Sequence, residues 1–336
     1  MCLGFVGVCL YVYRSKPPII PITMPTPTVT PNPGFSAEEE SQALRKAMKG
    51  LGTNEKAIIE SVARMSNSQR QETIKTFKTM FGRDLIDDLK SELGGDFEDT
   101  VLALFMKPAK FDATCLHKAI SGLGTKDKVL IEIMCSRTNE QIAEIKAAYK
   151  KKFKNELEKD IKGDTSGDYE RLLVSLCQGG REEKPVDPAL AAAEAQKLYE
   201  AGEKSFGTDE SVFNYIICLR SYDQLRATFH EYVKLSGHTI IKAIKNEFSG
   251  NVEDGLCTVA KVAINPAEFF AEMAYTSMKG AGTDEDRLIR VIVSRSEIDL
   301  EDIKTEFQKA YGKSLASWIK DDCGGDFKRM LLAIVR

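Results

Sequence analysis

Four carboxylates follow four glycine-rich turns at one constant distance, and these residues are the ones whose types and spacing could do chemistry. The turns share a Gly-x-Gly-Thr pattern, altered in the third copy: Met48–Thr53, Ile120–Thr125, Lys204–Thr208 and Met278–Thr283. In each copy an acid stands 42 positions after one residue of the turn: Glu92 after Gly50, Asp164 after Gly122, Glu247 after Ser205 and Asp322 after Gly280. A second short turn with glycine follows each acid. The chain therefore carries one candidate site in four copies.

These residue types suit a calcium site. Glycines let the backbone adopt conformations that are costly for other residues, so a turn of this kind can direct successive carbonyl oxygens at one point. If the two turns of a copy face each other, carbonyl oxygens and one carboxylate converge. Ca²⁺ accepts about 6–8 oxygen ligands in loose geometry, whereas Mg²⁺ requires a stricter octahedron. One carboxylate and about three carbonyls leave the sphere open, which favours an outside oxygen donor such as a phospholipid phosphate.

A purely structural interpretation competes with the metal site. A single Gly-x-Gly-Thr segment is more often a helix-capping turn, and its Thr is a suitable N-cap for the next helix. The acids Glu55, Asp127, Glu210 and Glu285 likewise suit the positive first turn of that helix. Duplication copies structure as faithfully as function, so repetition alone leaves both interpretations open. The apolar loop-tip residues Leu51, Leu123 and Phe206 are predicted to contact the membrane interface.

Composition excludes several other classes of protein. Lys and Arg total 47 against 50 Asp and Glu, with no basic tract of the kind that binds nucleic acid. The three histidines are far apart in sequence, which argues against a zinc site. The eight cysteines form no Cys-x-x-Cys pair, which is typical of reduced, packing thiols. We find no nucleophile elbow, P-loop, metal-histidine set or paired catalytic acids, so we predict that the protein is not an enzyme.

The elements that must position the four sites are helices. From Ser36 onward apolar residues recur at helical spacing, as in Ile58, Ile59 and Val62, and no alternating strand pattern competes. Each copy is read as a helix, the turn, two helices, a short helix, the second turn and an apolar closing helix. Successive turns lie 72, 83 and 75 residues apart, and the extra residues fall in 181–194, which has two prolines and a charge run. We therefore expect four repeats in two pairs, divided near 181–190. The predicted division is a tail at 1–34, repeats at 35–107 and 108–180, a linker at 181–194, and repeats at 195–264 and 265–336.

The first 34 residues differ from the rest of the chain. Residues 1–13 are apolar but too short to span a bilayer, which needs about 20 residues, and no basic residue precedes them as in a secretory signal. Three interpretations stay open: a disordered tail that is lipid-modified at Cys2 or Cys9, a cryptic signal or anchor, or an incidental extension. Residues 17–34 contain seven prolines and no charge, so we expect an extended, semi-rigid linker.

Several long segments resemble the annexin family, and the resemblance covers about 36–336. They include MKGLGT, FGRDLIDDLKSEL, GDTSGDYERLL and MKGAGTDEDRLIRVIVSRSEIDL. The resemblance implies an all-α fold of four annexin-type repeats, each of five helices, packed as a curved disc with calcium sites on its convex side. It also implies Ca²⁺ as the cofactor and calcium-dependent binding to acidic, phosphatidylserine-like phospholipid membranes. The alternative function is a helical-repeat scaffold that binds proteins without metal.

The resemblance also implies a location. It predicts a cytoplasmic protein that is peripheral at membranes in a calcium-dependent manner. The head of the chain matches no annexin tail that we recognise, so secretion or anchoring through residues 1–13 stays an alternative. A protein partner for the tail and self-assembly on membranes also stay open.

The resemblance assigns ligands to each site. The first site would use the carbonyls of Met48, Gly50 and Gly52 with the carboxylate of Glu92. The equivalent sets are Ile120, Gly122, Gly124 and Asp164; Gly202, Ser205, Gly207 and Glu247; and Met278, Gly280, Gly282 and Asp322. Glu55, Asp127, Glu210 and Glu285 match the family's weaker secondary metal positions. The third loop departs from the pattern in having Ser205 and a different residue count. Arg137, Arg220 and Arg295 match an arginine after the second helix, where the first repeat has Met65, and we interpret them as structural.

Overall fold

Helices account for all the regular structure in the described part of the chain. The computed structural model describes residues 24–50, 52–204 and 207–336, and the twenty elements found there are all α-helices. Ile58 and Val62, on the apolar face expected from their spacing, are fully buried. The all-α prediction is therefore confirmed.

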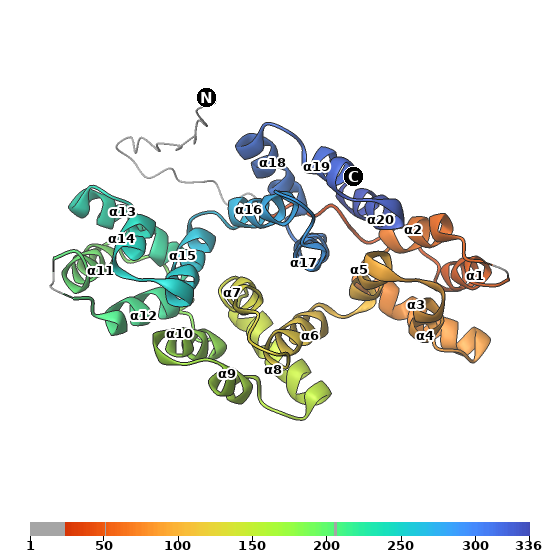
Figure 1. The fold of residues 1–336 in the computed structure, drawn as a ribbon, viewed down its shortest axis with the longest axis horizontal. Coiled ribbons are helices and arrows are strands. Elements are labelled where there is room, and N and C mark those ends of the chain that lie inside the picture. The colour runs from red at the N-terminus through yellow and green to blue at the C-terminus, as the bar shows by residue number, and fades with distance from the viewer. Residues whose placement is uncertain (1–23, 51, 205–206) are drawn as a thin grey trace.

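Each repeat consists of five helices in the expected order. The first contains α1 (Ala37–Ala47), α2 (Glu55–Ala63), α3 (Asn67–Phe81), α4 (Leu85–Glu92) and α5 (Gly95–Phe105). The second contains α6 (Pro108–Ile120), α7 (Asp127–Met134), α8 (Asn139–Phe153), α9 (Leu157–Asp164) and α10 (Gly167–Cys177). The third contains α11 (Pro188–Ala201), α12 (Glu210–Leu219), α13 (Tyr222–Ser236), α14 (Ile240–Glu247) and α15 (Gly250–Ile264). The fourth contains α16 (Pro266–Met278), α17 (Glu285–Arg295), α18 (Leu300–Tyr311), α19 (Leu315–Asp322) and α20 (Gly325–Val335). Figure 1 shows the repeats arranged in chain order around a common centre to form a disc.

Packing pairs the repeats differently from their order in the chain. One apolar core joins helices of the first and fourth repeats, and a second core joins helices of the second and third. Across these boundaries α2 contacts α20, and α10 contacts both α12 and α15. A Cβ built on Gly255 of α15 would lie only 2.5 Å from Leu172 of α10, so the bare glycine permits this close approach. The expected division into pairs near 181–190 is therefore wrong, because apolar burial groups repeat one with four and two with three.

The segment 181–194 is only partly a linker. Residues 181–187 form no helix or strand and lie on the end of α12, where the Glu182 N–H donates to the Leu219 carbonyl (2.7 Å) and the Arg181 side chain donates to the Ile217 carbonyl (2.7 Å). Helix α11 then begins at Pro188, because proline suits the first helical position and the Asp187 side chain caps the next amides. The third repeat therefore begins inside the expected linker.

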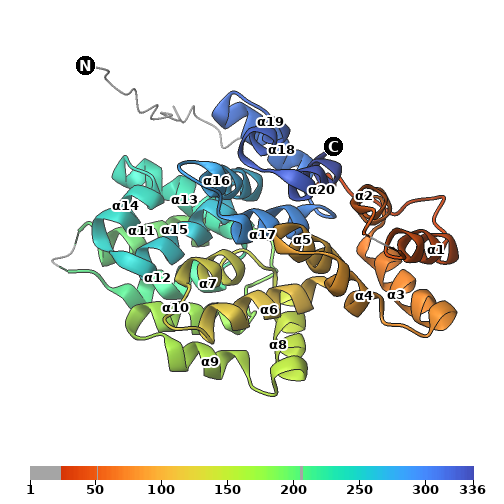
Figure 2. The same ribbon diagram turned by 45° about the vertical axis from the view of Figure 1, so that its right-hand side comes forward.

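The N-terminal segment connects the fourth repeat to the first. We call residues 24–34 the strap; they form no helix or strand, and they contain a bend at Thr28 and a turn at Pro33 and Gly34. The N–H groups of Thr28 and Val29 both donate to the Ser296 carbonyl at 2.9 Å, and the Asn32 N–H donates to Gln69 Oε1 at 3.0 Å. Val29 is only 5% exposed. In both views the strap runs from beside α18 towards the first repeat (Figures 1 and 2). It is therefore docked rather than free.

Two further expectations concern the membrane and the cysteines. None of the helices formed by the described residues combines the length and hydropathy needed to cross a bilayer. The six cysteines in the described ranges are free thiols, and all but Cys115 are buried. This agrees with packing thiols. Cys2 and Cys9 lie outside the described residues.

Candidate metal sites

The two turns of every repeat meet through one repeated hydrogen bond. The Thr that closes each glycine-rich turn donates its hydroxyl to the acid found 39 residues later. The four distances are 2.7 Å for Thr53 to Glu92, 2.6 Å for Thr125 to Asp164, 2.7 Å for Thr208 to Glu247 and 2.6 Å for Thr283 to Asp322. The structure thus places each acid against the turn with which it was paired by sequence spacing.

The role expected for these threonines as helix N-caps is wrong. Helices α2, α7, α12 and α17 have as their N-cap residues Asn54, Lys126, Asp209 and Asp284, each one position after the Thr. The Asn and Asp side chains accept the amide hydrogen bonds of the first turn, which leaves each Thr hydroxyl free to hold the acid. Sequence reasoning missed this contact, although the constant 39-residue interval between Thr and acid is a signal that could have revealed it.

Each glycine-rich turn is closed by a backbone hydrogen bond at its base. The N–H after the Thr donates to the carbonyl before the turn: Asn54 to Ala47 (2.9 Å), Lys126 to Ala119 (2.9 Å), Asp209 to Ala201 (2.8 Å) and Asp284 to Ser277 (2.7 Å). The two residues that this bond joins are separated by six residues in the first, second and fourth repeats and by seven residues in the third repeat. The departure noted in the third loop is therefore one inserted residue. Ser205 and Phe206 lie outside the described residues, as does Leu51 in the first loop.

The described backbone of the first turn leaves carbonyl oxygens without hydrogen-bond partners. In the first turn Gly50 and Gly52 have φ of 122° and 85°, and in the fourth Gly280 and Gly282 have φ of 128° and 96°, conformations that favour glycine. Within the described part of the chain, the carbonyls of Met48, Gly50 and Gly52 accept no hydrogen bond from the backbone or from a side chain. Uncommitted carbonyl oxygens beside a carboxylate are the donor set that Ca²⁺ prefers.

Each acid occupies an electrostatically unfavourable position. Glu92, Asp164, Glu247 and Asp322 are the last residues of α4, α9, α14 and α19. The C-terminal end of a helix carries partial negative charge and favours cations, at about 0.3–1 kcal/mol for an exposed group. A carboxylate in that position in all four repeats is therefore not explained by helix stability, and a bound cation would offset the repulsion.

The secondary acids need no metal to account for their positions. Glu55, Asp127, Glu210 and Glu285 are the first residues of α2, α7, α12 and α17, where the helix dipole favours negative charge. Glu55 nevertheless borders the same surface hollow as Glu92, and Asp127 borders the same hollow as Asp164. Their assignment as secondary ligands stays a prediction.

The sites of neighbouring repeats share surface hollows. One is lined by Glu55, Glu92 and the second turn of the fourth repeat at Gly324–Asp326. Another is lined by Asp127, Asp164 and Ser249 of the third repeat. A third joins Thr125 and Asp127 to Asp284 and Asp286 at the fourth turn. The turns of all four repeats therefore border one connected face, which we call the turn face, and Leu123 at a loop tip on it is fully exposed.

No side-chain metal cluster in the described part of the chain competes with these sites. Among the described residues, no group of three or more His, Cys, Asp or Glu side chains is placed to hold a metal ion. A site built from backbone carbonyls and a single carboxylate does not form such a cluster, so the donor set fits a hard, loosely coordinated cation better than a transition metal.

The arginines after the second helices are structural. Arg137 bonds to Asp112 at 2.7 and 3.0 Å, Arg220 to Glu194 at 2.6 Å, and Arg295 to Asp299 at 2.7 and 2.6 Å, and all six side chains are nearly or fully buried. In the first repeat Met65 is fully buried in the equivalent place, and the neighbouring Arg64 bonds to Glu40. These contacts bear out the interpretation of the arginines as helix-end structure.

The fold and the repeated sites together define a class: a disc of four five-helix repeats with a carbonyl-rich turn and a carboxylate in each. The annexin family model matches residues 39–104, 111–176, 193–259 and 269–334. Annexin A7 of Homo sapiens is 50% identical over 324 residues, which cover 96% of this chain and 66% of that protein. The chain thus spans about two thirds of that relative's length. Among solved structures, annexin III superimposes with a TM-score of 0.91 at 45% identity, covering 93% of this chain and 97% of that one. A structure described as calcium-bound annexin (Sm)1 has a TM-score of 0.84 at 37% identity, covering 93% of each chain. The chain belongs to the annexin family.

Proposed function

We propose that this protein binds acidic phospholipid membranes in a calcium-dependent manner, and that it does so without a catalytic step. The observation that carries the proposal is the acid at the C-terminal end of a helix, which faces a glycine-rich turn in all four repeats. Family membership and the calcium-bound state of annexin (Sm)1 support it.

Each site would be formed by one turn and one acid. The carbonyls of Met48, Gly50 and Gly52 with Glu92 would hold one ion, and the equivalent residues of the other repeats would hold the rest. When bound there, Ca²⁺ would supply positive charge and open positions for a lipid phosphate oxygen. The Thr hydroxyl keeps the carboxylate directed at the turn, and the exposed Leu123 adds apolar contact at the interface.

The charge of the chain is consistent with a requirement for calcium. A net charge of −3 gives no general attraction to an anionic membrane. The acids of the turn face add local repulsion, so a cation must lie between the protein and the phosphates. We therefore propose a peripheral membrane protein of the cytoplasm that leaves the membrane when calcium falls. Protein partners of the tail and assembly on the membrane stay predictions.

Co-sedimentation with vesicles tests the function directly. We expect binding to phosphatidylserine vesicles with calcium, release by a chelator, and little binding to vesicles of phosphatidylcholine alone. Binding that does not depend on calcium would contradict the proposal and favour the metal-independent scaffold.

Charge-neutralising variants test the site residues. Glu92→Gln with Asp322→Asn removes two of the four carboxylates, and we expect the calcium concentration for half-maximal binding to rise about tenfold, which corresponds to about 1.4 kcal/mol. The matched control is Asp87→Asn with Asp321→Asn, since these exposed acids lie on the same helices, α4 and α19, and their loss changes the net charge equally. An equal calcium requirement for the two pairs would rule out the assigned ligands.

A further inference from the structure

A cavity of about 220 Å³ lies where the first, second and fourth repeats meet. Its lining includes the C-terminal ends of α5 and α17, whereas the glycine-rich turns and second turns lie at the N-terminal ends of these helices. Each helix has 11 residues and is therefore about 16 Å long. The cavity is thus separated from the turn face by the length of the helices, and the proposed calcium function does not use it.

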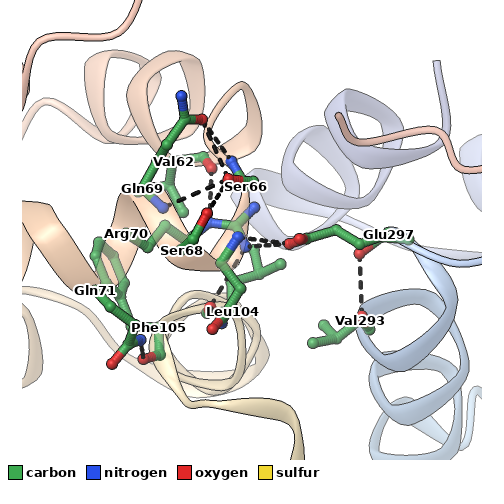
Figure 3. Close-up of polar contacts among 12 residues, drawn as sticks. Val62, Ser66, Ser68, Gln69, Arg70, Gln71, Leu104, Phe105, Val293 and Glu297 are labelled. Atoms are coloured by element: carbon green, nitrogen blue, oxygen red, sulfur yellow. Dashed lines mark hydrogen bonds and ion pairs between the residues drawn. The ribbon is translucent and has the colours of Figure 1, made fainter. Parts of the chain in front are cut away.

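The wall of the cavity combines apolar side chains with two buried arginines, Arg70 and Arg137. Leu104, Phe111 and Val293 are among the apolar lining residues. Arg70, which is 1% exposed, also lines it. Arg70 Nε donates to the Val62 carbonyl at 3.1 Å, and its Nη1 donates to the Leu104 carbonyl at 3.4 Å. Figure 3 shows this arginine between helices of the first repeat, with Glu297 of the fourth repeat opposite.

Two lining residues carry a buried donor that has no partner among the described residues. These atoms are Arg70 Nη2 and Ser294 Oγ. The other arginine in the wall, Arg137, is already paired with Asp112 through two hydrogen bonds. A buried donor without an acceptor costs about 1–3 kcal/mol. These two donors are therefore available to an added oxygen acceptor, although the carboxylates of Asp112, Glu144 and Glu297 also line the cavity.

The charge of Arg70 is also incompletely balanced. Its nearest carboxylate, Glu297, lies 3.3 Å from Nη1, and the Glu297 side chain is 33% exposed. Burial lowers the pKa of Arg70 to about 10, and the attraction of Glu297 only partly opposes this effect. Glu297 also accepts from the Asn67 N–H at 2.7 Å, so its carboxylate is shared. An additional anionic oxygen would stabilise the guanidinium.

We propose that this cavity binds a small apolar molecule carrying one carboxylate, with the carboxylate on Arg70 and Ser294 and the apolar body against Leu104, Phe111 and Val293. An apolar cavity of about 150 Å³ is enough to hold benzene, so 220 Å³ accommodates an aromatic or short branched monocarboxylate. Glu297 competes with such a ligand, because its carboxylate already accepts a hydrogen bond from Nη1 of the same guanidinium.

Calorimetric titration of the full chain in chelator with benzoate and with its neutral isostere benzamide tests the proposal. We expect one benzoate bound per chain and at least tenfold weaker binding of benzamide. Equal binding of the two compounds would overturn the role of the carboxylate.

Variants separate this site from a general change in the protein. Glu297→Gln removes the competitor, so we expect benzoate to bind several-fold more tightly, while Glu301→Gln, a neighbouring acid outside the cavity, leaves the affinity unchanged. Ala103→Leu fills the cavity wall and should abolish binding while calcium-dependent vesicle binding persists. Failure of both the natural chain and Glu297→Gln to bind benzoate would overturn the proposal, and so would undiminished binding to Ala103→Leu.

Discussion

At the residue scale, each candidate site depends on an acid held in an unfavourable position by a threonine. Asp322, for example, ends α19, where the helix dipole opposes a negative charge, and the Thr283 hydroxyl lies 2.6 Å from its Oδ2. One hydrogen bond to a charged group contributes about 1.5–3 kcal/mol. The threonine therefore acts as a positioning residue for the carboxylate.

Replacing two of these threonines should raise the calcium concentration that membrane binding requires, although no proposed calcium ligand is removed. We expect Thr53→Val with Thr283→Val to raise the calcium needed for half-maximal vesicle binding about three- to tenfold, because the carboxylates lose their preset orientation. The measurement is vesicle co-sedimentation across a calcium series. Thr79→Val is the control, since its exposed hydroxyl only bonds to the Lys75 carbonyl within α3. A variant pair that behaves like the control would show that the threonines do not position the acids.

The buried thiols make stability depend on pH at the alkaline end. Burial raises the pKa of Cys177, Cys257 and Cys323 to about 11 and that of Cys115 and Cys218 to about 12, from an ordinary value of 9.0. The unfolded chain therefore loses these protons at lower pH than the folded chain. The stabilising contribution is complete below pH 9 and is lost as the pH rises through about 11–12.

We expect the urea midpoint of unfolding to fall between pH 9 and 11. We also expect iodoacetamide at pH 8 to leave the four buried cysteines of this set, Cys177, Cys218, Cys257 and Cys323, unmodified in the native protein, as read by peptide mass spectrometry, because the thiolate is the reactive form. The same labelling in denaturant is the control. Rapid native labelling of any of these four would contradict the burial described here.

At the element scale, the strap joins two repeats that are distant in sequence. Three of its residues bond to the α17–α18 turn or the start of α18: Thr28 and Val29 contact Ser296, and the Thr26 carbonyl accepts from the Glu301 N–H at 3.0 Å. Asn32 then exchanges two hydrogen bonds with the Gln69 side chain of α3. The strap thereby spans the boundary between the first and fourth repeats.

A charged side chain in place of Val29 should detach the strap from the core between the first and fourth repeats. We expect Val29→Asp to lower the free energy of unfolding by about 2 kcal/mol, because it removes buried apolar surface and places a carboxylate in the core between two repeats. Thermal unfolding followed by circular dichroism gives the measurement. The neighbour Thr30 is exposed, so Thr30→Asp should have little effect and serves as the control. Equal losses in both variants would show that docking of Val29 is not the cause.

At the scale of the whole molecule, the two apolar cores are connected by a buried ion pair. Arg290 of α17 donates to Glu132 of α7 at 2.9 Å, and both side chains are at least nine-tenths buried. Burial lowers the pKa of Arg290, but the charge of Glu132 and its hydrogen bond raise it more, so the net shift is upward. The pair thus links the core of repeats one and four to that of repeats two and three.

Removing one member of this ion pair should destabilise the protein more than replacing both members with apolar residues. We expect Glu132→Ala to cost about 3–5 kcal/mol in urea unfolding, because Arg290 is left buried without a counter-ion. The double variant Glu132→Met with Arg290→Met should recover most of that loss, since apolar side chains of similar volume replace both charges. A double variant no more stable than Glu132→Ala would show that packing, not charge, dominates here.

The sequence by itself determined the repeats, their helices and the pairing of each turn with its acid. Periodic apolar residues and constant intervals are local or repeated patterns, and each can be recognised without knowing which residues distant in sequence are in contact. Only the tertiary structure decided that repeat one packs with four, that Thr53 holds Glu92 instead of capping α2, and that the strap lies against Ser296. These depend on which surfaces meet in space, because apolar burial has no direction along the chain and a hydroxyl bonds to whichever acceptor the fold brings near.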